Sequence, residues 1–317
     1  MTNTNSGRME RLDPRFDALI SRDVSLDVLA DFSEREGAHW LEGPAWDQRN
    51  GYLLFSDVKA NAIYRWERDQ GVQLFMQPSG YTGEQPFAGE EPGSNGLAFD
   101  AEGHLLICEH GDRRIRRLET DGSKTVLADR YQGRRLNSPN DLVCRSNGDI
   151  YFTDPPFGLP RQFDDPGREL SFSGVYRLST GGELTLLLDD LRAPNGIGFS
   201  PDEQTLYVAD SDQNRSAWLA YPMQADGTLG EGRVLLDVTR APGLGGPDGL
   251  EIDRLGNIFG AGREAVFVLA ADGTHLGTID MGAITTNVGW GEDGSTLFIT
   301  TERRLLRLRL STRGTGF

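Results

Sequence analysis

Short apolar runs alternate with turn residues along most of the chain, and the clearest example runs from Pro194 to Asp210. It predicts a strand over 197–199 and a second strand over 205–209, because apolar runs of about 4–8 residues broken by turn residues are typical of β-strands. The same pattern occurs in six copies. Each copy has a large residue at one shared position: Trp46, Phe99, Cys144, Phe199, Ile252 and Trp290.

Six repeats of this size predict one closed array of blades rather than two separate domains. The last repeat ends at 305–310 without an outer strand, while the alternating segment 24–32 stands before the first repeat as a surplus strand. We therefore expect an all-β fold: a six-bladed β-propeller with four-stranded blades, closed by the N-terminal strand, which completes the last blade. An open β-solenoid is the alternative.

The expected domain organisation is an N-terminal extension over 1–22 and a single propeller domain over 23–317. Within the extension, Asp13-Pro14 predicts the start of a short helix, because proline suits a first helical turn. Two long segments, 77–94 and 155–171, interrupt the repeats. They are expected to be functional loops that shape specificity, since structureless loops of this length are uncommon in compact domains.

Charge and composition restrict the class of protein. A net charge of −16 argues against nucleic-acid or anionic-membrane partners and favours sites for cations. No apolar run is long enough to span a membrane, and the first ten residues lack the apolar core of a secretory signal, so a cytoplasmic location is expected. Cys108 and Cys144 fall in different repeats and are expected to be isolated buried thiols. The oligomeric state is left open.

One position in each repeat, four residues before the shared large residue, is mostly a carboxylate or an amide. The six residues there are Glu42, Asn95, Asn140, Asn195, Asp248 and Thr286. In a propeller the first strand of each blade lines the central channel, and this position is expected to precede that strand immediately. The six side chains are therefore expected at one mouth of the channel.

Oxygen ligands at one level suggest a metal site formed by four of these residues: Glu42, Asn140, Asn195 and Asp248. Carboxylate and amide oxygens are hard ligands that suit Ca²⁺, with Mn²⁺, Mg²⁺ or, more weakly, Zn²⁺ in its place. Asn95 is expected to contact substrate or water. The alternative is that each Asn or Asp before Gly is a turn former that holds the chain through local hydrogen bonds. Glu42 fits that alternative poorly, because Glu is a poor turn residue.

A second set of polar residues follows the second strand of four repeats. The pairs are Ser56-Asp57, Glu109-His110, Thr153-Asp154 and Ala209-Asp210. Their expected place is toward the opposite end of the strand pair, or on the loops beyond it, and most are expected to be structural. Two of them, His110 and Asp154, are retained as candidate substrate-binding residues.

Several motifs together resemble the calcium-dependent gluconolactonase family, which includes regucalcin and the luciferin-regenerating enzymes. The matching segments are Trp40-Leu41-Glu42-Gly43-Pro44, Leu136-Asn137-Ser138-Pro139-Asn140-Asp141-Leu142, Tyr151-Phe152-Thr153-Asp154-Pro155, Pro194-Asn195-Gly196 and Pro247-Asp248-Gly249-Leu250. The resemblance implies a six-bladed propeller, a divalent cation on the same four residues, and hydrolysis of a sugar lactone to the aldonic acid.

The resemblance also implies that Asp248 acts as the catalytic general base or, as the weaker alternative, as a nucleophile. The Arg-x-Asn-Asp-Gly pattern of the animal members is absent, and Ser138-Pro139-Asn140-Asp141 stands in its place. No substrate-binding arginine can therefore be carried over. Two other functions stay open for such a propeller: a phosphotriesterase or other esterase, and a non-enzymatic calcium-binding scaffold.

Overall fold

Alternating apolar residues build a series of antiparallel sheets, which the computed structural model describes for residues 4–5 and 8–317. Among these residues there are six sheets of four or five strands and one two-stranded sheet, with almost no helix. The prediction of a six-bladed β-propeller is confirmed. By contacts the chain divides into two compact units, residues 36–195 and residues 196–317 together with the N-terminal segment.

The unit 36–195 contains three four-stranded sheets and a short hairpin. The first sheet is β4 (Leu41–Asp47), β5 (Tyr52–Asp57), β6 (Ala62–Glu67) and β7 (Gly71–Met76). The second is β8 (Ser94–Phe99), β9 (Leu105–Glu109), β10 (Arg114–Leu118) and β11 (Lys124–Ala128). The hairpin is β12 (Arg130–Tyr131) with β13 (Arg134–Arg135). The third sheet is β14 (Leu142–Cys144), β15 (Ile150–Asp154), β16 (Gly174–Leu178) and β17 (Leu184–Leu188), with the 3₁₀ turn η1 (Gln162–Asp164) before β16.

The other unit contains the remaining three sheets. The fourth sheet is β18 (Pro194–Phe199, whose first two residues belong to the unit 36–195), β19 (Thr205–Asp210), β20 (Ala217–Pro222) and β21 (Arg233–Asp237). The fifth is β22 (Pro247–Ile252), β23 (Ile258–Gly262), β24 (Ala265–Leu269) and β25 (His275–Asp280), with β2 (Met9–Arg11) at its edge. The sixth is β26 (Thr285–Gly291), β27 (Thr296–Thr301) and β28 (Arg304–Arg309), followed by β3 (Leu26–Asp31) and β1 (Thr4–Asn5).

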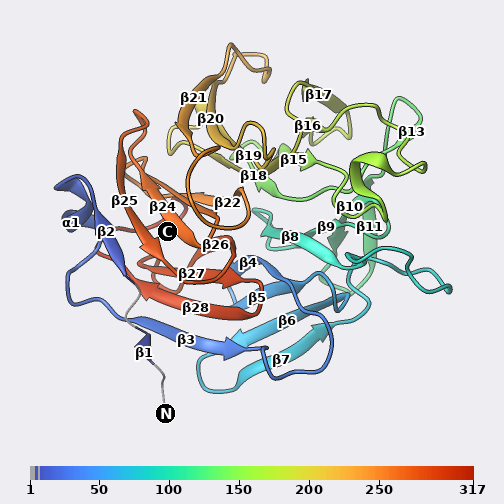
Figure 1. Cartoon of the computed structure of the whole chain (residues 1–317). Helices are drawn as coiled ribbons and strands as arrows, with labels where there is room; N and C mark the ends of the chain where they lie inside the picture. The colour runs from blue at the N-terminus through green and yellow to red at the C-terminus, as the bar shows by residue number, and fades with distance from the viewer. Residues whose placement is uncertain (1–3, 6–7) are drawn as a thin grey trace. The chain divides into compact units, whose positions relative to one another are not determined.

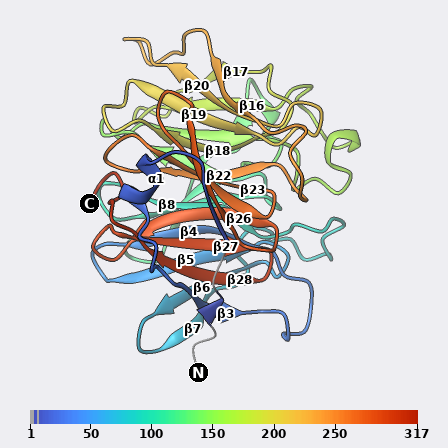
Figure 2. The same ribbon diagram turned by 60° about the vertical axis from the view of Figure 1, so that its left-hand side comes forward.

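The N-terminal strand completes the last sheet, as the surplus strand predicted. β3 pairs antiparallel with β28, from Arg304 opposite Asp31 to Leu308 opposite Leu26. Figures 1 and 2 show the two strands side by side, β3 in blue and β28 in red. Arg307 strengthens the pairing with a 2.9 Å ion pair from its Nη2 to Asp27 Oδ2. Two segments from opposite ends of the sequence therefore share one sheet, which protects the edge of β28.

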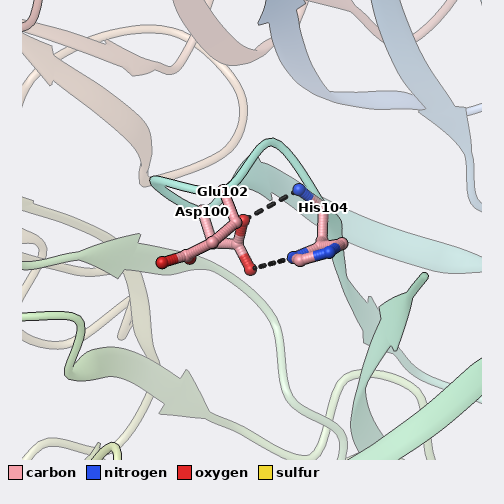
Figure 3. Close-up of side chains that lie close together, drawn as sticks. All are labelled: Asp100, Glu102 and His104. Atoms are coloured by element: carbon pink, nitrogen blue, oxygen red, sulfur yellow. Dashed lines mark hydrogen bonds and ion pairs between the residues drawn. The ribbon is translucent and has the colours of Figure 1, made fainter. Parts of the chain in front are cut away.

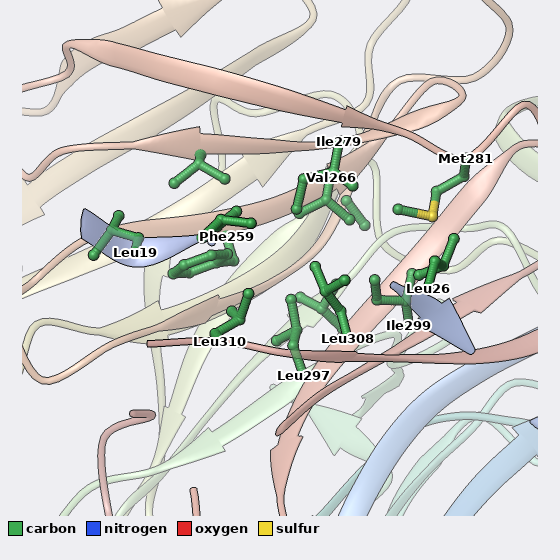
Figure 4. Close-up of a cluster of buried hydrophobic side chains, with 14 of the residues drawn as sticks. Leu19, Leu26, Phe259, Val266, Ile279, Met281, Leu297, Ile299, Leu308 and Leu310 are labelled. Carbon is green, nitrogen blue, oxygen red and sulfur yellow. The ribbon is translucent and has the colours of Figure 1, made fainter. Parts of the chain in front are cut away.

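The described part of the expected N-terminal extension packs on the same unit. β2 pairs with β25, and the predicted short helix is present as α1 (Arg15–Leu19). Phe16, Leu19 and Ile20 are buried in the core that β23–β28 form (Figure 4). Burying a large apolar side chain contributes about 1.5–3 kcal/mol, so this segment stabilises the unit substantially. None of the helices in the part of the chain described here is long and apolar enough to span a membrane.

Candidate active site

The shared polar position of the repeats lies inside the first strand of most blades, which corrects the prediction that it precedes that strand. β4, β8, β18 and β22 each begin one residue before it. The β4–β5 pairing runs from Glu42 opposite Ser56 directly to Ala45 opposite Leu54, so two residues face one. Similar register shifts occur in β8–β9, β22–β23 and β26–β27. A β-bulge of this kind lets a strand continue through Gly and Pro and re-aims the side chain beside it, often next to an active site.

The glycine after the polar position allows adjacent blades to approach closely. A Cβ on Gly96 would lie 2.6 Å from Asp141 Oδ1 and 2.7 Å from the Asn140 carbonyl oxygen. The Gly96 N–H donates to that carbonyl oxygen at 2.7 Å. Gly43 has a φ of +51°, and a Cβ there would lie 2.3 Å from the Asn95 carbonyl oxygen. The glycines thus bring the polar residues of neighbouring blades together, since no larger residue fits there.

Two of the predicted metal ligands, Asn140 and Asn195, are in direct contact. Asn140 Nδ2 donates to Asn195 Oδ1 at 2.5 Å, and both residues are buried. Thr153 of β15 links the backbone beside both residues. Its Oγ1 donates to the Asn195 carbonyl oxygen at 2.8 Å and accepts from the Asp141 N–H at 3.2 Å. The repeat suggested that Thr153 is structural, but only the fold shows that it fixes Asn195.

Glu42 and Asn95 occupy the same register in the two preceding blades. Glu42 is 2% exposed, and its Oε2 accepts the Gly43 N–H at 3.0 Å. Asn95 is 5% exposed, and its Oδ1 has no hydrogen-bond partner among the described residues. Because a buried amide oxygen without a partner costs about 1–3 kcal/mol, its position favours a ligand or water that donates to it.

The second set of polar residues lies beside the first set, so the prediction that it lies toward the opposite end of the strand pair is wrong. Ser56 faces Glu42, and Glu109 faces Ser94, in the antiparallel pairing. The reason is simple: the end of the second strand of an antiparallel pair lies next to the start of the first. Ser56 Oγ and Ser94 Oγ also meet at 2.7 Å, which links β5 to β8.

His110 follows β9 and is fully buried against Asn140. Its Nε2 lies 3.2 Å from Asn140 Oδ1, and its Nδ1 lies 3.0 Å from Glu91 Oε2. The Glu91 carboxylate thus lies close to Nδ1, although the two groups are not aligned as a hydrogen bond. With 0% exposure, His110 contacts a candidate ligand instead of lining an open surface. We predicted that His110 binds substrate, and its contacts with Asn140 and Glu91 do not support that prediction.

Asp154 at the end of β15 is also fully buried, and it organises the segment before Asn140. Its two carboxylate oxygens accept the N–H groups of Asn137 at 2.8 Å and Ser138 at 2.9 Å. Burial raises the pKa of Asp154 to about 8, against the lowering effect of these two N–H groups and of the Arg113 guanidinium. The described contacts are structural, and substrate binding by Asp154 likewise stays a prediction without support from them.

The two long loops meet beside His110. A Cβ on Gly158, in the 155–171 loop, would lie 2.5 Å from His110 Cβ and 2.9 Å from Ser138 Cβ. In the 77–94 loop, Gly89 approaches Pro160 so closely that a Cβ there would lie 3.1 Å from Pro160 Cα. The sequence predicted functional loops here, but no pattern in it pointed to their contact or to Glu91.

The start of the 77–94 loop is held rigidly. Asn61 Oδ1 accepts the N–H groups of Ser79, Gly80 and Tyr81, at 3.1, 2.8 and 3.2 Å. After these three residues the loop lines an open pocket of about 490 Å³, with Tyr81 and Phe87 in its wall. The two rings pack at 5.0 Å between centroids. The loop is therefore a preformed part of this unit.

Asp248 is the one predicted ligand within the other compact unit. It lies at the bulge of β22, in the same register as Glu42 and Asn95 in their strands. The next residue, Gly249, is covered by the Asn287 side chain, since a Cβ on Gly249 would lie 1.9 Å from Asn287 Oδ1. The local arrangement therefore repeats that of the other unit, where Asp141 covers Gly96.

A separate cluster of Asp100, Glu102 and His104 lies in the turn between β8 and β9 (Figure 3). Asp100 accepts the His104 N–H at 2.8 Å through Oδ1, and its Oδ2 lies 2.9 Å from His104 Nδ1. These are the contacts of a turn. The cluster is at the end of the β8–β9 pair opposite to Asn95 and His110.

The chain is similar to known proteins over most of its length. The family model described as SMP-30/gluconolactonase/LRE-like region matches residues 40–303. A gluconolactonase from Zymomonas mobilis is 37% identical over 324 residues, which cover 99% of this chain and 89% of the relative. A pentonolactonase from Haloferax volcanii is 26% identical over 82% of this chain and 80% of its own. The solved structure of a gluconolactonase from Xanthomonas campestris is 33% identical, with a TM-score of 0.81, over 98% of this chain and 100% of its own. The chain therefore belongs to the SMP-30/gluconolactonase/LRE-like family.

Proposed function

We propose that this protein is a sugar lactonase, a hydrolase that opens a gluconolactone-like ring to the aldonic acid. The observation that carries the proposal is the contact between the buried amides of Asn140 and Asn195, in a chain similar along its whole length to a protein named gluconolactonase. Glu42 and Asn95 are buried at the same register of the two preceding blades. A sugar lactone is polyhydroxylated, and polar groups fixed by buried hydrogen bonds suit its recognition.

A divalent cation fits the residues present. Asn140 and Asn195 bring amide groups into contact, and the buried Asn95 Oδ1 lacks a partner among the described residues. The proposed ligands offer hard oxygen donors and none of them is Cys or His, which favours Ca²⁺, with Mn²⁺, Mg²⁺ or Zn²⁺ as alternatives. In the proposal Glu42, Asn140, Asn195 and Asp248 hold the cation. For Asp248 this rests on its register in the repeat and on the resemblance.

Hydrolysis of a lactone joins a water oxygen to the carbonyl carbon and breaks the bond from that carbon to the ring oxygen. A proton passes from the water to the leaving ring oxygen. A bound cation would polarise the carbonyl and stabilise the negative charge that develops on its oxygen. In the proposal the Asp248 carboxylate removes the proton from the attacking water as general base. Asn95 accepts a hydrogen bond from a substrate hydroxyl or a water through its free Oδ1.

The test is hydrolysis of glucono-1,5-lactone by chelator-treated protein, with each cation added back separately and spontaneous hydrolysis subtracted. We expect cation-dependent turnover that falls by at least about 10²-fold in Asp248→Asn, since general-base catalysis contributes about 10²–10⁴-fold. Glu42→Gln is expected to lose cation affinity. Asp272→Asn, a change in an exposed turn, is the control.

Two outcomes would contradict parts of the proposal. Full turnover by an Asp248→Asn protein that still binds the cation removes the general-base role. Turnover of a phosphotriester but of no lactone, measured in parallel, would reject the lactonase and retain a hydrolase. The cytoplasmic location, which these assays do not test, stays a prediction.

A further inference from the structure

We propose that Glu91 and His110 form a positioning device that turns the Asn140 amide so that its oxygen faces the cation. The inference rests on the cation site proposed above. It starts from a continuous chain of contacts: Glu91 Oε2 to His110 Nδ1 at 3.0 Å, His110 Nε2 to Asn140 Oδ1 at 3.2 Å, and Asn140 Nδ2 to Asn195 Oδ1 at 2.5 Å. The chain leads from the 77–94 loop into the set of candidate ligands.

His110 cannot easily move away from this position. Its backbone N–H donates to the Gly93 carbonyl oxygen at 3.1 Å, and the residue is 0% exposed. Gly158 of the other loop packs against its Cβ, since a side chain at position 158 would place its own Cβ only 2.5 Å from His110 Cβ. The imidazole is therefore locked between the two loops, and only its protons and the groups at its two nitrogens can vary.

Glu91 selects the proton position on the ring. A carboxylate 3.0 Å from Nδ1 favours a proton on that nitrogen. A neutral imidazole with its proton on Nδ1 carries a lone pair on Nε2, so that Nε2 accepts a hydrogen bond. The group that can donate to it is the Nδ2 end of the Asn140 amide.

An asparagine amide can present either end, because the two orientations differ by about 180° around its last side-chain bond and fill nearly the same volume. In one orientation Oδ1 faces His110 and Nδ2 donates to Asn195, which is the arrangement in this structure. In the other orientation Nδ2 donates to His110, and Oδ1 lies beside Asn195 Oδ1. Two adjacent amide oxygens are what a hard cation requires. The Glu91–His110 pair favours this second orientation and thereby prepares Asn140 as a ligand.

The test is titration calorimetry of chelator-treated protein with Ca²⁺ alone and with Mn²⁺ alone. Glu91→Gln places an amide that can donate to Nδ1, which favours the other tautomer and turns Asn140 Oδ1 toward His110. We expect cation affinity to fall about 10–100-fold, as for other partners of metal ligands. Glu90→Gln is the matched control, because the neighbouring Glu90 side chain is 87% exposed and loses the same charge. It should bind as the unchanged protein does.

Two further measurements separate positioning from general damage. Without cation, Glu91→Gln should have the same melting temperature as the unchanged protein. At saturating Ca²⁺ its lactone turnover should return to within about twofold of that of the unchanged protein, since only cation binding is altered. The double variant Glu91→Gln/His110→Phe should bind the cation as tightly as His110→Phe alone. Glu91 acts through His110, so its change has no further effect on cation affinity once the imidazole is absent.

Equal affinities of Glu91→Gln and Glu90→Gln would overturn this inference while leaving the cation site and the lactonase proposal intact. Additive losses in the double variant would overturn the route through His110. If the unchanged protein binds neither cation, the inference and the cation site are both overturned, and the lactone assay then decides on the lactonase alone.

Discussion

Replacing Thr153 by Val tests how the fold holds Asn195. The change keeps the shape of the side chain and removes a hydroxyl that is 0% exposed. It deletes two hydrogen bonds, one to the Asn195 carbonyl oxygen at 2.8 Å and one from the Asp141 N–H at 3.2 Å. A buried hydrogen bond contributes about 0.5–1.5 kcal/mol, so we expect the free energy of unfolding to fall by about 1–3 kcal/mol.

The measurement is thermal and urea unfolding followed by circular dichroism. A loss of this size corresponds to a melting temperature about 2–12 °C lower, on the scale of about 2–4 °C per kcal/mol for domains of 150–250 residues. The slope of the urea transition should not change, because the same surface is exposed on unfolding. Cation affinity should also fall, since Asn195 loses its support.

Two companion variants make the reasoning refutable. Thr153→Ser keeps the hydroxyl and should recover most of the lost stability. Thr185→Val makes the same substitution in the half-buried outer strand β17 and should have little effect. If Thr153→Val is no less stable than Thr185→Val, the two hydrogen bonds do not hold Asn195 in the way described.

Two other changes test the close approach of the blades and the buried carboxyl group. Gly96→Ala should destabilise the protein by about 1–3 kcal/mol in urea unfolding, because its Cβ would overlap Asp141. Gly181→Ala should not, because a Cβ there would meet only Ser179 Oγ, at an ordinary contact distance of 3.7 Å. Equal stabilities of the two variants would contradict this reasoning. Burial raises the pKa of Asp154 to about 8, so the folded state holds this proton more tightly than the unfolded state does. Its contribution to stability is full below about pH 4 and is lost as the pH rises through about 8. The melting temperature should therefore fall more from pH 5 to 9 in the unchanged protein than in Asp154→Asn. The exposed control Asp69→Asn should keep the full slope, and parallel profiles of all three proteins would disprove the shift.

Local sequence patterns determined the secondary structure and its repetition. A strand over 197–199 was predicted and β18 is Pro194–Phe199, while a strand over 205–209 was predicted and β19 is Thr205–Asp210. Such segments are predictable because apolar alternation and turn residues act over a few neighbours. The last repeat ends at 305–310 without an outer strand, and together with the surplus strand at 24–32 this predicted the pairing of β28 with β3.

The spacing of the repeats also selected the polar register. Asn140 and Asn195 were grouped because they stand at equal places in successive copies, and the structure brings them into contact. Glu42 and Asn95 occupy the same register in the two preceding blades. Repetition of the sequence predicts equivalent positions, and the packing of neighbouring blades brings Asn140 and Asn195 together.

Only the tertiary structure decided how these residues are held. The bulge that keeps Glu42 inside β4 forms only against the partner strand β5. In the sequence alone, Gly43 and Pro44 indicate that a strand ends there. The contact between Glu91 and His110 and the burial of Asp154 join segments from different blades and loops. Hydrogen bonds and burial between distant segments leave no local periodicity, which is why the sequence determined the strands and the polar register, and the fold determined their chemistry.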